Sequence, residues 1–133
     1  MIAAIRWLLV VPAALLGWYI AFAFVAALHS LATHFCPLEA LISGACVATW
    51  FPFAESLLSA LFAGLAAGLV VLFPALVAPS HRPWIAWLAF ICGLAVALYF
   101  ALQLPVAPEF SVAAAVGLLV AIFIGKRHAP TVA

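Results

Sequence analysis

Two cysteines lie close together in the sequence and could react with each other. Cys36 and Cys46 flank the segment PLEALISGA, in which Pro37 can open a short helix and Gly44 can close it. Such a helix would turn the chain back, so we predict a structural disulfide that contributes about 3 kcal/mol to the stability of the loop. A catalytic redox pair is the alternative, but redox-active thiols typically occupy a CxxC motif, which this pair does not form.

Side chains of the types that bind zinc or copper surround these cysteines. The set consists of His29, His34, Cys36, Glu39 and Cys46. Its spacing matches no established ligand pattern, and a disulfide would leave neither sulfur free to bind a metal. We therefore expect no metal site, and His29 and His34 are the remaining candidates if one exists. Haem would need two histidines that face each other from different spans, so we expect no cofactor.

The composition indicates what must hold these residues in place. Of the 133 residues, 72% are hydrophobic and 5% are charged, whereas a soluble domain has about 25% charged residues because water must solvate its surface. Four apolar segments have the length of membrane spans, and each must be helical because backbone groups in lipid bond within the segment. They cover residues 5–28, 53–77, 84–104 and 108–125. We predict one all-α domain over residues 1–133, a compact four-helix transmembrane bundle with an outer loop at 29–52.

The charged residues separate completely between the two sides of this four-span arrangement. The basic residues lie near the two termini and in the second loop: Arg6, Arg82, Lys126 and Arg127. The acidic residues fall on the opposite side: Glu39, Glu55 and Glu109. Basic residues stay on the cytoplasmic side of a membrane, so we predict that both termini are cytoplasmic. The loop with the cysteines would then face the oxidising periplasm of a bacterial inner (plasma) membrane, where disulfides form.

Two of the acids, Glu55 and Glu109, lie near the outer ends of predicted helices. A carboxylate at a helix N-terminus interacts favourably with the helix dipole, and this effect explains both positions. The alternative is an acidic outer mouth that attracts cations. Together with His29, His34 and Glu39, these two acids form a candidate outer polar cluster.

Small residues recur at every fourth position in each predicted span. Such stripes allow helix backbones to approach closely in lipid, where no hydrophobic effect drives helices together. We predict that five glycines lie at helix contacts: Gly17, Gly64, Gly68, Gly93 and Gly117. These contacts can form within one chain or between chains.

The middle of each span contains no carboxylate, lysine or histidine, the side chains that mark proton relays and ion paths. We therefore expect a non-enzymatic protein: an accessory, assembly or stabilising subunit of an inner-membrane complex, or a homo-oligomer. Its partners would be the lipid bilayer and another membrane protein or a second copy, and no basic patch suggests nucleic acid. A small oligomeric transporter or channel for a lipid or hydrophobic solute is the alternative. A third reading is a periplasm-facing redox or metal-handling protein that uses Cys36 and Cys46.

Overall fold

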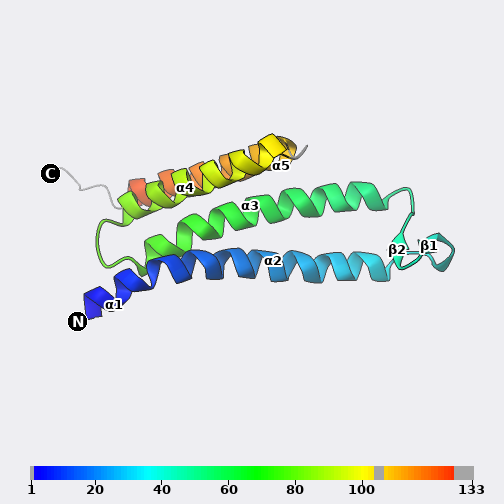
Figure 1. Cartoon of the computed structure of the whole chain (residues 1–133), viewed down its shortest axis with the longest axis horizontal. Coiled ribbons are helices and arrows are strands. Elements are labelled where there is room, and N and C mark those ends of the chain that lie inside the picture. Colours follow the sequence, from blue (N-terminus) through cyan, green and yellow to red (C-terminus); the bar gives the residue numbers. More distant parts are fainter. Residues whose placement is uncertain (1, 104–106, 128–133) are drawn as a thin grey trace.

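Long apolar stretches fold into helices in the computed structural model, which describes residues 2–103 and 107–127. The long helices are α2 (Val10–His34), α3 (Phe51–Val77), α4 (Arg82–Gln103) and α5 (Ala107–Arg127), and the short helix α1 (Ile2–Leu8) precedes them. Figure 1 shows α2 and α3 joined by a loop that holds strands β1 (Leu41–Ile42) and β2 (Ala45–Cys46). The four long helices have the length and composition to cross a membrane, which confirms the predicted all-helical class and the four candidate spans.

Helix α1 is separated from α2 by a break at Leu9. Pro12 explains the break, because proline has no N–H to donate to the carbonyl group one turn earlier. The side chain of Arg6 reaches across to the end of α3, where its Nε donates a hydrogen bond of 3.0 Å to the carbonyl oxygen of Val77. The predicted first span, residues 5–28, is thus divided near its start.

The far end of α2 also differs from the prediction, which ended this span at Leu28. No proline or glycine lies between Leu28 and His34, and the helix continues to His34. It stops before Cys36 because the next residue, Pro37, disfavours helical backbone in the residue that precedes it. The connecting loop is therefore shorter than predicted and covers residues 35–50. We call this segment the disulfide loop.

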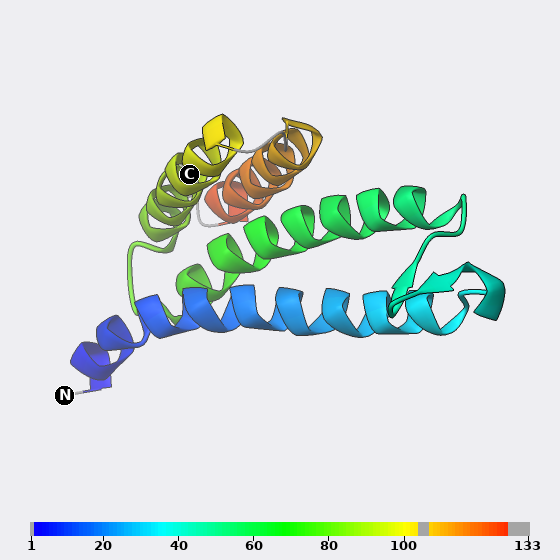
Figure 2. The ribbon, with the colours of Figure 1, turned by 45° about the vertical axis from the view of Figure 1, so that its right-hand side comes forward.

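Helix α3 lies at the centre of the molecule. It packs against α2 on one side and against α4 and α5 on the other, and α4 and α5 also pack against each other. Figure 2 shows these as two helix pairs, α2 with α3 and α4 with α5. A buried core lies where α3, α4 and α5 meet, near the loop that joins α3 to α4. It consists of Val71, Ala75, Ala86, Ala121 and Ile124.

At Gly17 the backbones of α2 and α3 touch. A Cβ added to Gly17 would lie 2.8 Å from the carbonyl oxygen of Leu69, so no larger residue fits unless the helices move apart. Gly117 brings α5 close to α4 in a similar way, because a Cβ there would lie 3.0 Å from a ring carbon of Phe90. Both glycines therefore lie at helix contacts within the chain.

Gly64 and Gly68 lie on the side of α3 that faces α5. A Cβ added to either one would lie 3.3 Å from a methyl carbon, of Val112 in the first case and of Val116 in the second. Gly93 of α4 differs, because a Cβ added there would meet nothing within 4 Å. The helix contact predicted at Gly93 is therefore not made by any described part of this chain.

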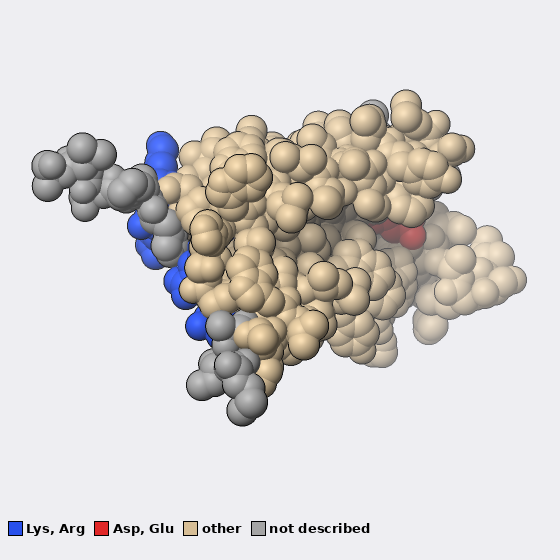
Figure 3. All heavy atoms as spheres, turned by 60° about the vertical axis from the view of Figure 1, so that its left-hand side comes forward, with Lys and Arg blue, Asp and Glu red and all other residues tan. Residues whose placement is uncertain are grey.

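Most large apolar side chains on the long helices are exposed, as is typical of helices that face lipid. In α4 only Ala86 is buried, and the described residues include no buried polar or charged side chain. Figure 3 shows lysine and arginine side chains at one end of the molecule and acidic atoms in a hollow away from that end. The surface is thus mainly apolar, with opposite charges separated along its length.

Candidate functional site

The predicted bond between Cys36 and Cys46 is present, with a Cα–Cα distance of 6.0 Å. It joins the end of α2 to strand β2, in which Cys46 pairs with Leu41 of β1. The turn between the strands is formed by Ser43 and Gly44, whose φ angles are positive, at 51° and 84°. Two-residue hairpins favour such turns, and glycine adopts positive φ without steric cost. The structure confirms the disulfide and shows that a hairpin positions it.

The backbone between the cysteines differs from the predicted short helix. A 3-10 helix after Pro37 covers only Leu38–Ala40, and Gly44 lies in the hairpin turn instead of ending a helix. The backbone N–H of Val47 donates a 2.9 Å hydrogen bond to the carbonyl oxygen of Ala40, which closes the base of the hairpin. A short helix does follow Pro37, as predicted. The role predicted for Gly44 was wrong, because a glycine near the end of a short segment suits a helix terminus and a hairpin turn equally well.

The outer polar residues do not converge on one point. His34 ends α2, and Glu39 lies exposed in the 3-10 helix. Among the residues that the structure describes, no group of three histidine, cysteine or carboxylate side chains is placed to hold a metal ion. Because Cys36 and Cys46 are bonded to each other, Cys92 is the free cysteine, and it lies exposed on α4.

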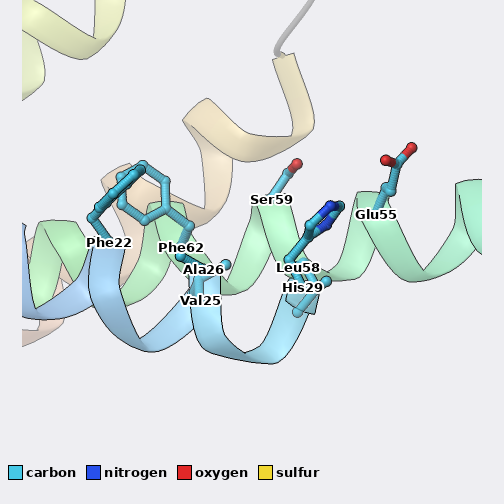
Figure 4. Close-up of a pocket in the computed structure, with 8 residues that line it drawn as sticks. All are labelled: Phe22, Val25, Ala26, His29, Glu55, Leu58, Ser59 and Phe62. Atoms are coloured by element: carbon cyan, nitrogen blue, oxygen red, sulfur yellow. The ribbon is translucent and has the colours of Figure 1, made fainter. Parts of the chain in front are cut away.

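His29 and Glu55 both line a groove between α2 and α3, with a volume of about 620 Å³. Its lining consists of Phe22, Val25, Ala26 and His29 of α2 and Glu55, Leu58, Ser59 and Phe62 of α3. Figure 4 shows the His29 ring and the Glu55 carboxylate at one end, Ser59 further along, and the two phenyl rings at the other end. We call this feature the α2–α3 groove. It is polar near the disulfide loop and apolar at its far end.

Aromatic contacts shape both ends of the α2–α3 groove. At the apolar end, the rings of Trp18 and Phe22 stack with centroids 5.7 Å apart, and the Phe62 ring meets them edge-on at 6.1 and 6.4 Å. At the polar end, the His29 ring packs edge-on against the buried ring of Phe51, with centroids 5.8 Å apart. The groove is therefore built on side chains that helix packing already holds in place.

Glu55 and Glu109 differ in their relation to the helix dipoles. Glu109 lies in the first turn of α5, whereas α3 begins at Phe51, so Glu55 lies beyond the first turn of its helix. The dipole acts within the first turn, so it explains Glu109 better than Glu55. Glu109 precedes Val112, which lies opposite Gly64, by about one helical turn, and it is not among the residues that line the α2–α3 groove. Its Oε2 atom is buried and has no hydrogen-bond partner in the described part of the chain.

The sequence alone does not reveal this groove. Phe22 and Phe62 resemble lipid-facing residues of a span, and His29 falls outside the predicted helix because that helix ends too early. The sequence contains one indication of the groove: Phe22 and His29 lie two helical turns apart, and so do Glu55 and Phe62. Each pair therefore shares one helix face, but nothing in the sequence shows that the two faces meet.

Ser59, His29 and Glu55 have the residue types of a serine-hydrolase triad. Such a triad requires hydrogen bonds from serine to histidine and from histidine to the carboxylate. No hydrogen bond joins any two of these three side chains among the described residues. These three side chains therefore do not form a hydrogen-bonded triad in the described part of the chain.

Comparisons of the chain with models of protein families, with curated proteins and with solved structures find no match.

Proposed function

We propose that this chain is a non-enzymatic membrane subunit that assembles with a second copy of itself or with another membrane protein. The observation that carries the proposal is the open space beside Gly93 of α4. The other glycines considered above each face a neighbouring helix: Gly17, Gly64, Gly68 and Gly117. Small residues in spans serve helix contacts because they let backbones approach closely. Gly93 therefore offers a contact for a helix from outside the chain.

The exposure of α4 supports the same proposal. The structure describes every residue of α4, and only Ala86 among them is buried. Ala89 and Ala97 extend the small-residue face on either side of Gly93, at the four-residue spacing of helix contacts in membranes. An accessory, assembly or stabilising role suits a chain whose helices offer packing surface and whose outer loop is held by a covalent bond.

We further propose that the chain lies in a bacterial inner membrane with both termini in the cytoplasm. The gathering of lysine and arginine at one end supports this orientation, because basic residues stay on the cytoplasmic side (Figure 3). The disulfide supports a periplasmic outer loop, because the periplasm is oxidising. Reporter domains inserted at Ser80 and Ser43 should report cytoplasm and periplasm, respectively. A cytoplasmic signal from Ser43 would contradict the orientation.

Cys92 allows a direct test of assembly, because it is free, exposed and adjacent to Gly93. A bismaleimide added to intact membranes should join two chains through Cys92, or one chain to a partner, and Cys92→Ser should abolish the product. Gly93→Leu should lower the yield because the leucine fills the open space. Ala95→Leu lies on the opposite face of α4 and is the matched control, so it should leave the yield of the cross-linked product unchanged. The proposal is wrong if no product forms and no stoichiometric partner co-purifies in mild detergent.

The α2–α3 groove favours a second candidate function, the handling of a lipid or hydrophobic solute. The groove combines an apolar end with a polar end on helices that are long enough to cross a membrane. Lipid or solute flux in proteoliposomes that contain only this chain tests that function. The redox and metal readings gain no support from the described residues, since Cys36 and Cys46 are bonded and no metal-binding group is found there.

A further inference from the structure

We propose that the α2–α3 groove binds a phospholipid whose headgroup carries a primary amine. The ammonium group lies against the carboxylate of Glu55, and one acyl chain lies along the apolar part of the groove. This site does not depend on the proposed assembly through α4, because the groove is formed by α2 and α3 alone.

The shape and lining of the groove match an amphiphile that lies lengthwise between the two helices. Figure 4 shows polar side chains, His29 and Glu55, at one end and the rings of Phe22 and Phe62 at the other. Pockets of about 300–1,000 Å³ hold ligands of small-molecule size, and this groove has about 620 Å³. It therefore has room for a headgroup and the first part of an acyl chain.

The negative charge of the Glu55 carboxylate favours a ligand with a cationic group. The side chain of Glu55 is exposed, and the lysines and arginines of the chain gather at the opposite end of the molecule, so none of them neutralises it (Figure 3). A ligand that brings positive charge and N–H donors complements the Glu55 carboxylate, because charge-assisted hydrogen bonds are the strong ones.

The position of the groove identifies the ligand as a membrane lipid and not a soluble amine. Its lining belongs to α2 and α3, which are apolar and long enough to cross a membrane, so the groove lies beside lipid. A primary ammonium group donates hydrogen bonds, whereas the quaternary ammonium of choline has no N–H. Acceptor atoms at the polar end belong to His29, Glu55 and Ser59. The groove should therefore distinguish an ethanolamine lipid from a choline lipid.

Native mass spectrometry of the purified full-length chain, titrated with phosphatidylethanolamine or phosphatidylcholine of identical acyl chains, tests this preference. We expect the ethanolamine lipid to bind about tenfold more tightly, a difference that one charge-assisted hydrogen bond can supply. Glu55→Gln keeps the shape of the side chain and removes its charge, so it should abolish most of the difference. Glu39→Gln, in the disulfide loop outside the groove, is the matched control and should preserve it.

A second pair of variants tests the location independently of charge. Ser59→Leu fills the groove, whereas Ser56→Leu places the same side chain at an exposed position of α3 outside the lining. We expect Ser59→Leu to weaken the binding of both lipids and Ser56→Leu to leave it unchanged. Equal binding of the two lipids to the unaltered chain overturns the proposal, as does a preference that survives in Glu55→Gln. Unchanged binding in Ser59→Leu overturns it as well.

Discussion

The contact between α2 and α3 is closed in one half of the molecule and open in the other. In the closed half, toward the loop that joins α3 to α4, Gly17 brings the backbone of α2 against that of Leu69. In the open half, toward the disulfide loop, the same two helices leave the α2–α3 groove with His29 and Glu55 at its polar end. Figure 2 shows that the axes of α2 and α3 diverge toward the disulfide loop.

The difference between the two halves shows how side-chain size sets the distance between helices in lipid. Without a hydrophobic effect to drive association, helices are held together by close packing, and a glycine permits the closest approach. Large side chains such as Phe22 and Phe62 keep the backbones apart and leave space beside them. In the open half, the helices touch through ring contacts such as those of Phe62 and His29, and the disulfide in the connecting loop limits how far α2 and α3 can separate.

We expect the largest effect from breaking the disulfide, because a covalent cross-link contributes more to stability than each of the ring contacts that join α2 and α3 in the open half. Cys36→Ser and Cys46→Ser should each lower the free energy of unfolding by about 3 kcal/mol, measured by denaturation in detergent. The double variant should add little, since both changes remove the same bond. Hydrogen exchange should rise in the disulfide loop and stay low around Gly17.

Alkylation of the denatured chain without reduction checks the bond itself. We expect one modified thiol, Cys92, because the other two cysteines are bonded. Three modified thiols would show that the disulfide is absent, and the contrast between a packed half and a covalently held half would then be wrong.

The closed half should be disrupted by Gly17→Ala. The new Cβ would lie 2.8 Å from the carbonyl oxygen of Leu69, and a backbone carbonyl cannot move aside as a side chain does. We expect a loss of about 1–3 kcal/mol in the free energy of unfolding, the usual cost of overpacking. The control is Gly125→Ala in α5, whose Cβ meets nothing within 4 Å and whose higher helix propensity should raise the stability by up to about 1 kcal/mol. Equal effects of the two changes on thermal unfolding would contradict the backbone contact.

A smaller effect is expected on the other side of α3, where it faces α5. A Cβ at Gly64 or Gly68 meets a valine methyl group at 3.3 Å, and a side chain can adjust its position. Gly64→Ala and Gly68→Ala should therefore each cost less than about 1 kcal/mol, whereas Gly64→Leu should cost more. Thermal unfolding in detergent measures both. A silent Gly64→Leu would show that α3 and α5 do not pack closely at this position.

The spans and the disulfide could be predicted from the sequence because both depend on local chemistry. An apolar run of sufficient length must form a helix in lipid, whichever neighbours it finds. Cys92 lies within such a run, which leaves Cys36 and Cys46 as the natural pair. The helix ends were less predictable, because the stretch from His29 to His34 is polar enough for a loop and yet contains no residue that breaks a helix.

The candidate site was decided by tertiary structure. The extension of α2 put His29 on a helix, and the packing of α2 on α3 then put it in one groove with Glu55. The packing of α2 on α3 also covered Gly17, whereas Gly93 of α4 stays open, although both belong to small-residue stripes of the same spacing. A repeat in sequence identifies a helix face, but which faces meet depends on how the helices pack together in three dimensions.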